Sequence, residues 1–231
     1  MSLYNFSSNS CGVCGIIEKI IKIGGKMLSN KGFDLWADDY DESVDISDDE
    51  NSYPFAGYKI IINQIYNRIL DASYKNVLDI GFGTGTLVSN LYEHGYKISG
   101  QDFSERMLEL AQEKMPDAKL FIGDISNGLV EPLLEHKYDA IIATYSLHHL
   151  TDDEKVIFLK DLLNQLNEGG AIYIGDVAFE THTELYNCRK EAGETWDEDE
   201  FYFVADDMKK YFPKMKFEKI SNCAGLFTLK K

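Results

Sequence analysis

Short apolar runs alternate with helical patterns through the middle of this chain, and this alternation constrains the fold more than any other feature. The runs cover residues 76–80, 97–100, 119–122, 138–144 and 171–177. Between them, apolar residues at three- and four-residue steps predict helices near 85–94, 104–115, 127–135 and 152–167. Near-continuous apolar strands that alternate with helices are typical of a parallel sheet covered on both faces. We therefore expect an α/β fold with a doubly wound sheet.

Capping signals and further periodic segments complete this expectation. Ser104 opens one predicted helix, and Thr151 with Glu154 forms a capping-box-like start to another, which we expect to end at Gly169 and Gly170 in the manner of a glycine cap. Isoleucines at helical spacing predict a helix over 55–71. Residues 215–220 and 224–229 predict two more strands.

The stretch VLDIGFGTGTL, residues 77–87, joins the first strand to the first helix through three glycines at alternate positions. A dinucleotide-binding loop has the spacing G-x-G-x-x-G instead, and the chain holds no G-x-x-x-x-G-K-[ST] phosphate loop. Asp79 precedes the first glycine by two residues, where its carboxylate would repel a pyrophosphate. This loop therefore favours a ligand with a cationic amine.

Two more acids follow the next two strands. Asp102 lies 21 residues after Gly81, at the position that accepts hydrogen bonds from ribose hydroxyls in doubly wound nucleotide sites. An acid at this position binds the ribose of dinucleotides and of other adenosine ligands alike, so it does not distinguish between these ligand classes. Asp124 follows the third strand and is a candidate acceptor for an adenine amino group, although a helix N-cap or a solvated turn is an equal interpretation.

These pieces together resemble a class I S-adenosylmethionine-dependent methyltransferase from about residue 33 to residue 178. The resemblance is strongest to small bacterial members whose N-terminal part reads Trp-Ala-x-x-Tyr-Asp, as residues 36–41 do here. Gln101 departs from the family pattern, in which an apolar residue usually precedes the acid. The matching segments are the loop 79–85, residues 100–107, Gly123 with Asp124, and residues 138–150.

The resemblance implies a Rossmann-like, mostly parallel, seven-stranded sheet with an N-terminal helical cap and a helical insertion after the fifth strand. It also implies S-adenosylmethionine as the cofactor, with Asp79 and the glycines at its methionine part, Asp102 at the ribose, and Tyr40 closing over it. Asp124 and Ile125 would border the adenine, and residues 144–146 would line the pocket near the sulfonium. The implied cofactor-binding residues are Tyr40, Asp79, Gly81, Gly83, Gly85, Asp102, Phe103, Met107, Gly123, Asp124, Ile125, Thr144, Tyr145 and Ser146.

A sulfonium is already an activated methyl donor, so the protein must mainly align the reactants, exclude water and in some reactions remove a proton. His148 and His149 follow the fourth strand at its carboxyl end, where open α/β sheets bind ligands. Together with Tyr145 they are the candidate general bases. Each of the three has a purely structural role as its alternative.

The sequence divides into an N-terminal extension, residues 1–26, a cap and helix, 27–72, and a methyltransferase core, 73–231, in which 180–212 form a lid. Gly24-Gly25-Lys26 is compatible with a ribosome-binding site at the DNA level, so we expect the native start at Met27. Cys11 and Cys14 form a lone CxxC motif. Without a second CxxC or a suitably spaced histidine pair, no metal site is predicted.

Charge limits the partners. Lys and Arg total 23 against 39 Asp and Glu, a formal charge of −16, with no basic cluster to bind nucleic acid. Two acidic, aromatic segments, 34–53 and 191–207, are either solvated surface or the rim of a pocket that steers a cationic or amine substrate. No apolar run reaches the length of a membrane span, and scattered cysteines indicate the cytoplasm.

We therefore expect a methyltransferase that acts on a small molecule. A non-catalytic module that binds S-adenosylmethionine is the alternative from another class. A nicotinamide-dependent oxidoreductase is disfavoured by the glycine spacing and by Asp79. The sequence leaves the methyl acceptor and the oligomeric state open.

Overall fold

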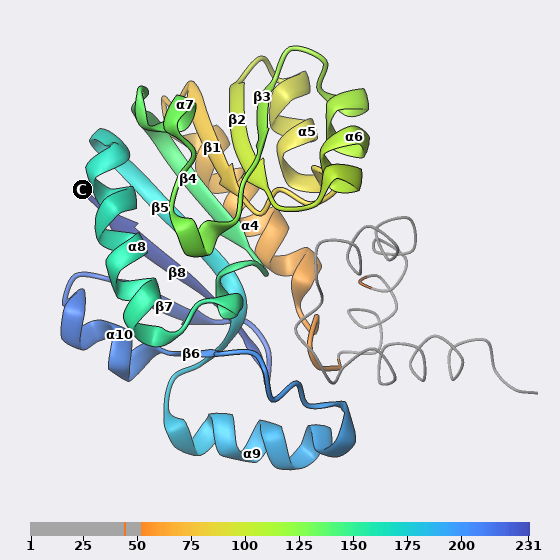
Figure 1. Ribbon diagram of the computed structural model, residues 1–231. Coiled ribbons are helices and arrows are strands. Elements are labelled where there is room, and N and C mark those ends of the chain that lie inside the picture. Colours follow the sequence, from red (N-terminus) through yellow and green to blue (C-terminus); the bar gives the residue numbers. More distant parts are fainter. Residues whose placement is uncertain (1–43, 45–51) are drawn as a thin grey trace, which may run out of the picture.

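The computed structural model describes Val44 and residues 52–231. Its main sheet has the strand order β3-β2-β1-β4-β5-β8-β7, with the short β6 pairing beside β5 off this path. Neighbouring strands from β3 to β5 run parallel, and β8 runs antiparallel to both β5 and β7. The expected α/β fold with a mostly parallel sheet and helices on both faces is confirmed (Figure 1).

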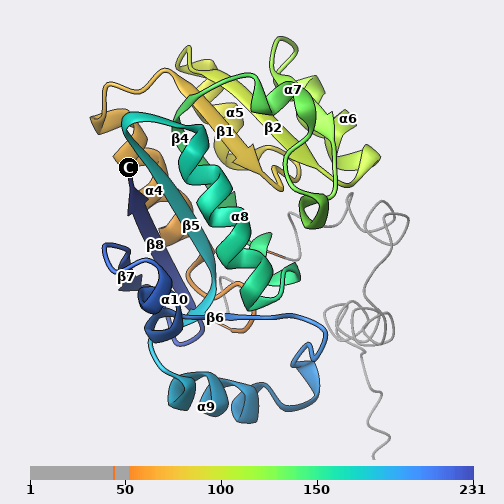
Figure 2. The same cartoon turned by 60° about the vertical axis from the view of Figure 1, so that its left-hand side comes forward.

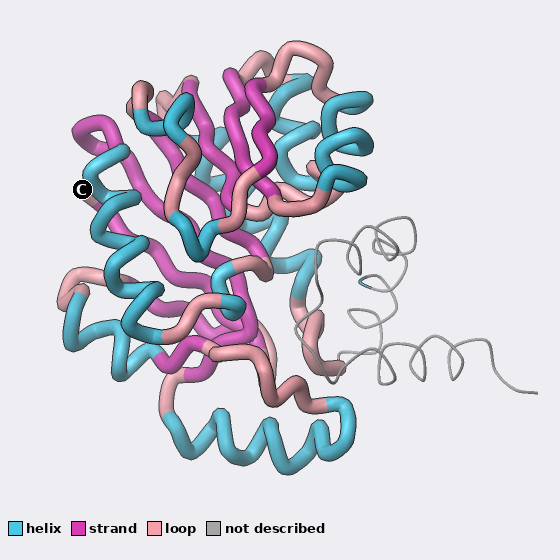
Figure 3. Tube along the Cα trace, viewed as in Figure 1, coloured by secondary structure: helices cyan, strands magenta, loops and turns pink. Residues whose placement is uncertain are grey.

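The elements follow one another in the predicted alternation, as the tube in Figure 3 shows. The strands are β1 (Asn76–Ile80), β2 (Lys97–Asp102), β3 (Lys119–Ile122), β4 (Tyr138–Thr144), β5 (Leu166–Phe179), β6 (Phe203–Val204), β7 (Lys216–Lys219) and β8 (Ala224–Lys230). The helices are α4 (Tyr58–Asp71), α5 (Thr86–Glu93), α6 (Glu105–Lys114), α7 (Glu131–Leu134), α8 (Asp152–Gln165), α9 (His182–Ala192) and α10 (Ala205–Tyr211), with short 3₁₀ turns η2 (Ile125–Asn127), η3 (Leu147–His149) and η4 (Gly193–Thr195).

Two apolar cores hold the layers together, one on each face of the sheet. On one face, side chains of α4, α5 and α6 pack on β1, β4 and β5, with Ile61, Ile65 and Leu91 fully buried. On the other face, α7, α8 and α10 supply a second core that includes Leu159 and Met208. Figures 1 and 2 show α8 lying across the front of the sheet and α4 behind it. Both faces are thereby covered, which allows the strands to be apolar throughout.

The helix α9 follows β5 and lies beyond the end of the sheet at which the parallel strands terminate, as Figures 1 and 2 both show. The chain then returns along β6 beside the last residues of β5, with Ala178 paired to Phe203. A polar segment, residues 193–202, connects α9 to β6. This segment brings the acidic residues near Glu200 to the carboxyl ends of β4 and β5.

The capping predictions are confirmed at two helices and wrong at one helix end. Ser104 caps α6, and Thr151 with Glu154 forms a full capping box on α8. The helix α8, however, ends at Gln165, and Gly169 and Gly170 already belong to β5. Leu166 pairs with Tyr138 of β4, so strand pairing takes over before the glycines are reached. The two strands expected at the C-terminal end are present as β7 and β8.

Several expectations lie outside the described residues: the extension 1–26 with Cys11 and Cys14, the start at Met27, and the cofactor contact of Tyr40. Among the residues that the structure describes, no helix has the length and apolar character of a membrane span.

Candidate active site

The glycine loop lies at the carboxyl end of β1, between that strand and α5. Gly81, Gly83 and Gly85 all have positive φ angles, of 69°, 54° and 76°. Gly81 N–H donates to Gln101 O of β2 at 2.8 Å, and Gly85 is the N-cap residue of α5. Residues with a Cβ atom adopt this left-handed region only at a cost in free energy, which explains why the loop needs glycines. The loop thereby turns the chain from β1 into α5 at the carboxyl end of the sheet.

Asp102 ends β2 and connects this loop to the next helix. Its Oδ2 accepts from Gly83 N–H at 2.9 Å, and its Oδ1 accepts from Ser104 N–H at 2.9 Å. The Ser104 side chain in turn accepts from Met107 N–H at the start of α6. The carboxylate is therefore held in one orientation at the carboxyl end of β2.

Asp79 is fully enclosed at the end of β1, with 2% of its surface exposed. Its Oδ1 has no hydrogen-bond partner among the described residues. Burial, and secondarily the nearby charge of Asp102, raises the pKa of Asp79 to about 8. A buried carboxyl oxygen that lacks a partner is costly in a folded protein and is informative for that reason.

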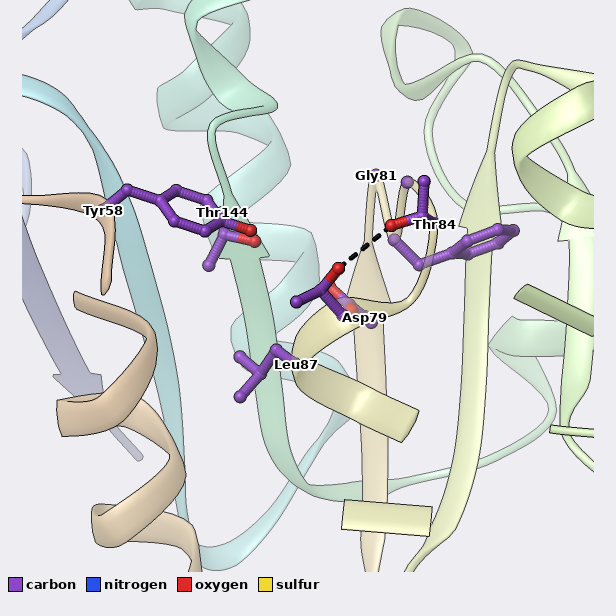
Figure 4. A pocket seen from close by; sticks show the side chains of 9 residues that line it. Tyr58, Asp79, Gly81, Thr84, Leu87 and Thr144 are labelled. Carbon is purple, nitrogen blue, oxygen red and sulfur yellow. Dashed lines mark hydrogen bonds between the residues drawn. The ribbon is translucent and has the colours of Figure 1, made fainter. Parts of the chain in front are cut away.

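A pocket opens beside Asp79. The structure places Tyr58 at the start of α4 and Thr144 at the end of β4 across from the glycine loop (Figure 4). Thr84 points toward Asp79 in the same view. A Cβ atom added at Gly83 would meet nothing within 4 Å, so one side of the loop faces open space. The pocket is lined by Tyr58, Asp79, Gly81, Phe82, Gly83, Thr84, Thr86, Leu87 and Thr144.

The third strand, β3, leads into the short turn η2. Exposed Asp124 caps η2 by accepting from Ser126 N–H at 2.8 Å, so it has the structural role considered for it. Gly123 lies against Val130, whose Cγ1 would be 2.6 Å from an added Cβ. Ile125 is half-buried in the same turn.

Gln101, the departure from the family pattern, has a clear structural role. Its amide donates to Gly128 O at 3.0 Å and accepts from Val130 N–H at 3.0 Å. Gln101 is fully buried, so these two hydrogen bonds satisfy it and hold the turn after β3 against the sheet.

The segment after β4 supports the glycine loop. Ser146 donates its hydroxyl to Ile80 O at 2.8 Å and packs directly against Gly81. Tyr145 has a positive φ of 50°, and its ring packs on Phe55 and Tyr58. Among the other residues suggested by the sequence, Met107 is buried at the start of α6 and Phe103 is half-buried before it.

Beyond this segment, His148 lies in a buried network of charges. Its Nδ1 donates to Asp176 Oδ1 at 2.7 Å, and its Nε2 lies 3.4 Å from Glu200 Oε1. Burial lowers the pKa of His148, but the charges of Glu200 and Asp176 outweigh burial and raise it to about 9. Burial and the charge of His148 lower the pKa of His149 to about 3. At neutral pH the two neighbouring rings thus differ in charge.

Aromatic residues tie the segment after α9 to the N-terminal side of the core. Tyr53 stacks on Trp196 with ring centroids 5.2 Å apart, and Tyr202 meets both rings edge-on. The hydroxyls of Tyr53 and Tyr202 are hydrogen-bonded. These ring contacts pack the segment after α9 against the core.

Sequence reasoning missed the residues that meet this site from other elements. Tyr58 belongs to α4, and no local motif indicates that it reaches the pocket. Asp176 carries a signal that could have found it, because it is an acid inside an apolar strand. Glu200 is one of many acids in its segment, and only the fold distinguishes it.

Comparison with known proteins identifies the family. The family described as "Methyltransferase domain" matches residues 77–170, which hold the glycine loop, Asp102 and both histidines. An uncharacterized methyltransferase of Geobacillus sp. strain WCH70 is 35% identical over 181 residues, covering 78% of this chain and 80% of that protein. This chain belongs to that methyltransferase family. A second methyltransferase, from Oceanobacillus iheyensis, is 33% identical over 192 residues, covering 80% and 87% of the two chains.

Solved structures agree with the methyltransferase fold. A crystal structure of an S-adenosylmethionine-dependent methyltransferase from Clostridium acetobutylicum superimposes with a TM-score of 0.61 at 18% identity, covering 83% of this chain and 98% of that one. The methyltransferase described here therefore shares its overall fold with a solved methyltransferase. The curated relatives are named as methyltransferases without a stated acceptor.

Proposed function

We propose that this methyltransferase takes S-adenosylmethionine as its methyl donor and transfers the methyl group to a small-molecule acceptor. The observation that carries the proposal is Asp79, a buried carboxyl whose Oδ1 has no partner among the described residues. It lies beside the open side of Gly83 in the pocket. An ammonium group of the cofactor would supply the missing charge partner. The solved relative named for this cofactor supports the same interpretation.

The residues present fit this cofactor. Asp79 would hold the amino group, and the glycine loop would lie against the methionine part. Asp102, which Gly83 and Ser104 hold in place, would accept hydrogen bonds from the ribose hydroxyls. When bound, the sulfonium supplies an activated methyl group, and the protein's task is to align the acceptor and keep out water. Thr144, at the end of β4, lines the pocket in which this alignment would take place.

The acceptor side would be formed by the carboxyl ends of β4 and β5 and the segment after α9. Acids gather there, with Glu200 partly enclosed, so we propose a cationic or amine acceptor in preference to an anionic one. Tyr145, His148 and His149 remain the candidates for removing a proton. The charges of Glu200 and Asp176 raise the pKa of His148 to about 9, so it carries its proton at neutral pH, which favours an orienting role for it. From the scattered cysteines and the net charge of −16 we also propose that the enzyme is cytoplasmic and does not act on nucleic acid.

Asp102→Ala is expected to weaken binding of S-adenosylmethionine by about 1–3 kcal/mol, because the ribose hydroxyls would lose their acceptor. The same change frees Gly83 N–H and Ser104 N–H, so a modest loss of protein stability should accompany it. Isothermal titration calorimetry measures the affinity, and thermal melting measures the stability. Glu109→Ala, an exposed change on α6, is the control. Unchanged affinity in the Asp102 variant would show that the ribose lies elsewhere.

Methyl transfer itself is tested by incubating the protein with S-adenosylmethionine carrying a labelled methyl group and with pools of cationic, neutral and anionic metabolites. The proposal predicts labelled product from the cationic pool and release of S-adenosylhomocysteine in equal amount. Cofactor binding without product in any pool would instead favour a non-catalytic binding module. Product from anionic acceptors alone would contradict the amine proposal while leaving the donor correct.

A further inference from the structure

Three metal-ligating side chains meet at the end of the sheet, outside the cofactor pocket. His148 and His149 lie in η3, and Glu200 comes from the segment after α9. One ligand atom from each of the three lies within 4.8 Å of the others. We propose that these residues form a binding site for a divalent transition-metal ion with two imidazole nitrogens and one carboxylate oxygen. The inference goes beyond the proposed function, because methyl transfer from a sulfonium does not itself need a metal.

The orientation of His148 is the first support. Asp176 accepts the Nδ1 proton of His148 at 2.7 Å, and its side chain is completely buried. This bond directs Nε2 toward Glu200, whose Oε1 lies 3.4 Å away. A carboxylate that holds the far nitrogen of a metal-ligating histidine is the usual outer partner in metal sites, because it fixes both the tautomer and the ring orientation.

Glu200 is held in place by its own segment. Phe201 N–H donates to His148 O at 2.8 Å, which joins this segment to η3 by a backbone hydrogen bond. Lys155 Nζ donates to Phe201 O from the α8 side. Glu200 also has a side-chain hydrogen bond to Tyr202. The carboxylate therefore reaches the histidines from a fixed backbone.

Charge around the cluster favours a cation. Asp176 and Glu200 bring two carboxylates, and Asp176 Oδ2 has no partner among the described residues. Lys155 is the basic side chain near the cluster. Its ammonium group donates hydrogen bonds to Asp152 Oδ1 at 3.1 Å and to the carbonyl oxygen of Phe201. Histidines that bind a metal are neutral. The two negative charges of Asp176 and Glu200 then exceed the single positive charge of Lys155. A dication at the cluster would reverse that balance.

The donor set indicates the class of ion. Two imidazoles and one carboxylate suit Zn²⁺ and its neighbours better than Mg²⁺ or Ca²⁺, which prefer oxygen ligands. Three protein ligands leave a coordination position open, as in catalytic rather than structural zinc sites. The sequence predicted no metal site, because adjacent histidines match no ligand-spacing motif and Glu200 lies far along the chain.

The test uses the full chain with Cys11→Ser and Cys14→Ser, which removes the thiols outside the described residues as competing ligands. After removal of metal with a chelator, the protein is titrated with Zn²⁺ by calorimetry, and with Co²⁺ while the visible absorption is recorded. We expect one ion per chain, and Co²⁺ bands without the charge-transfer absorption that thiolate ligands produce. No binding of either ion would overturn the proposal.

Variants locate the ion. His149→Ala and Glu200→Gln are each expected to weaken Zn²⁺ binding more than ~100-fold, and Asp176→Asn, which removes the outer carboxylate, by about 10–100-fold. His136→Ala and Asp199→Asn, two exposed changes of the same residue types, should leave the affinity unchanged. Equal affinity in the wild type, the His149 variant and the Glu200 variant would assign the ion to another site and overturn the proposal. Neither titration contains S-adenosylmethionine, so a negative result leaves the proposed function untouched.

Discussion

Asp79→Asn is expected to weaken S-adenosylmethionine binding about 100-fold or more while making the ligand-free protein more stable. The loss follows from removing one partner of a buried charge pair, which costs about 3–5 kcal/mol, and each 1.4 kcal/mol is a factor of ten in affinity. The gain in stability of the ligand-free protein also follows from the burial of this carboxyl. Asp79 is buried, and its Oδ1 has no partner among the described residues, so the ligand-free protein contains a carboxyl that the fold tolerates poorly.

The pH dependence of stability follows from the pKa of Asp79, which burial raises to about 8 from an ordinary value of 3.8. Between these values the unfolded chain has released this proton and the folded chain retains it. The folded state then binds more protons, so this group makes the ligand-free protein less stable as pH rises from about 4 to about 8. A pKa difference of one between the two states corresponds to about 1.4 kcal/mol. Asp79→Asn should therefore gain several degrees in Tm near pH 8 and little near pH 4.

Cofactor affinity should show the opposite trend with pH in the wild type. The carboxyl must lose its proton to pair with an ammonium group, so affinity should rise from about pH 6 to about pH 7.5 with release of up to one proton. Asp79→Asn should lack this rise. Calorimetry in buffers of different ionisation enthalpy measures the proton release, and Asp161→Asn, an exposed acid of α8, is the charge-matched control. A variant that binds the cofactor like the wild type would contradict the role of Asp79.

Alanine at two glycines of the same loop should produce two different defects. A Cβ at Gly81 would lie 2.5 Å from Ser146 Cβ, whereas a Cβ at Gly83 would meet nothing within 4 Å. Both positions have positive φ, so each alanine costs about 1–2 kcal/mol of backbone strain. Gly81→Ala adds about 1–3 kcal/mol of overpacking and should mainly destabilise the fold. Gly83→Ala instead projects a methyl group into the pocket and should mainly weaken cofactor binding.

Urea unfolding and cofactor titration, applied to both variants, separate these outcomes. Adding Ser146→Gly to the Gly81 variant removes the atom that clashes and should restore part of the lost stability, less the hydrogen bond from Ser146 to Ile80 O. The same addition should not help Gly83→Ala. Equal losses of stability in the two alanine variants would show that backbone strain, rather than contact with Ser146, dominates at this loop.

The sheet and its glycine loop could be predicted because their signals are local. Each strand is an apolar run of a few residues, and the spacing of Gly81, Gly83 and Gly85 is visible in five consecutive positions. Asp79 and Asp102 were placed at strand ends by the same runs, and the structure has them in β1 and at the end of β2. Their roles toward the cofactor stay predictions that the variants above test.

The remaining features depend on contacts between distant segments. His148 meets Asp176 of β5 and Glu200 of the segment after α9, and the pairing of β4 with β5 and the bond from Phe201 N–H to His148 O bring the three together. The end of α8 was misplaced because Gly169 and Gly170 imitate a helix cap, while pairing of Leu166 with β4 ends the helix earlier. The burial of Gln101 depends on the loop it binds, which no local pattern reveals.

We propose that the pocket between the glycine loop and β4 binds S-adenosylmethionine through Asp79 and Asp102. Calorimetric titration of the full chain with S-adenosylmethionine, S-adenosylhomocysteine and NAD tests it most directly. We expect one molecule of either adenosyl compound to bind per chain, the two to compete, and NAD to give no heat of binding. Binding of NAD, or the absence of binding by both adenosyl compounds, would contradict it.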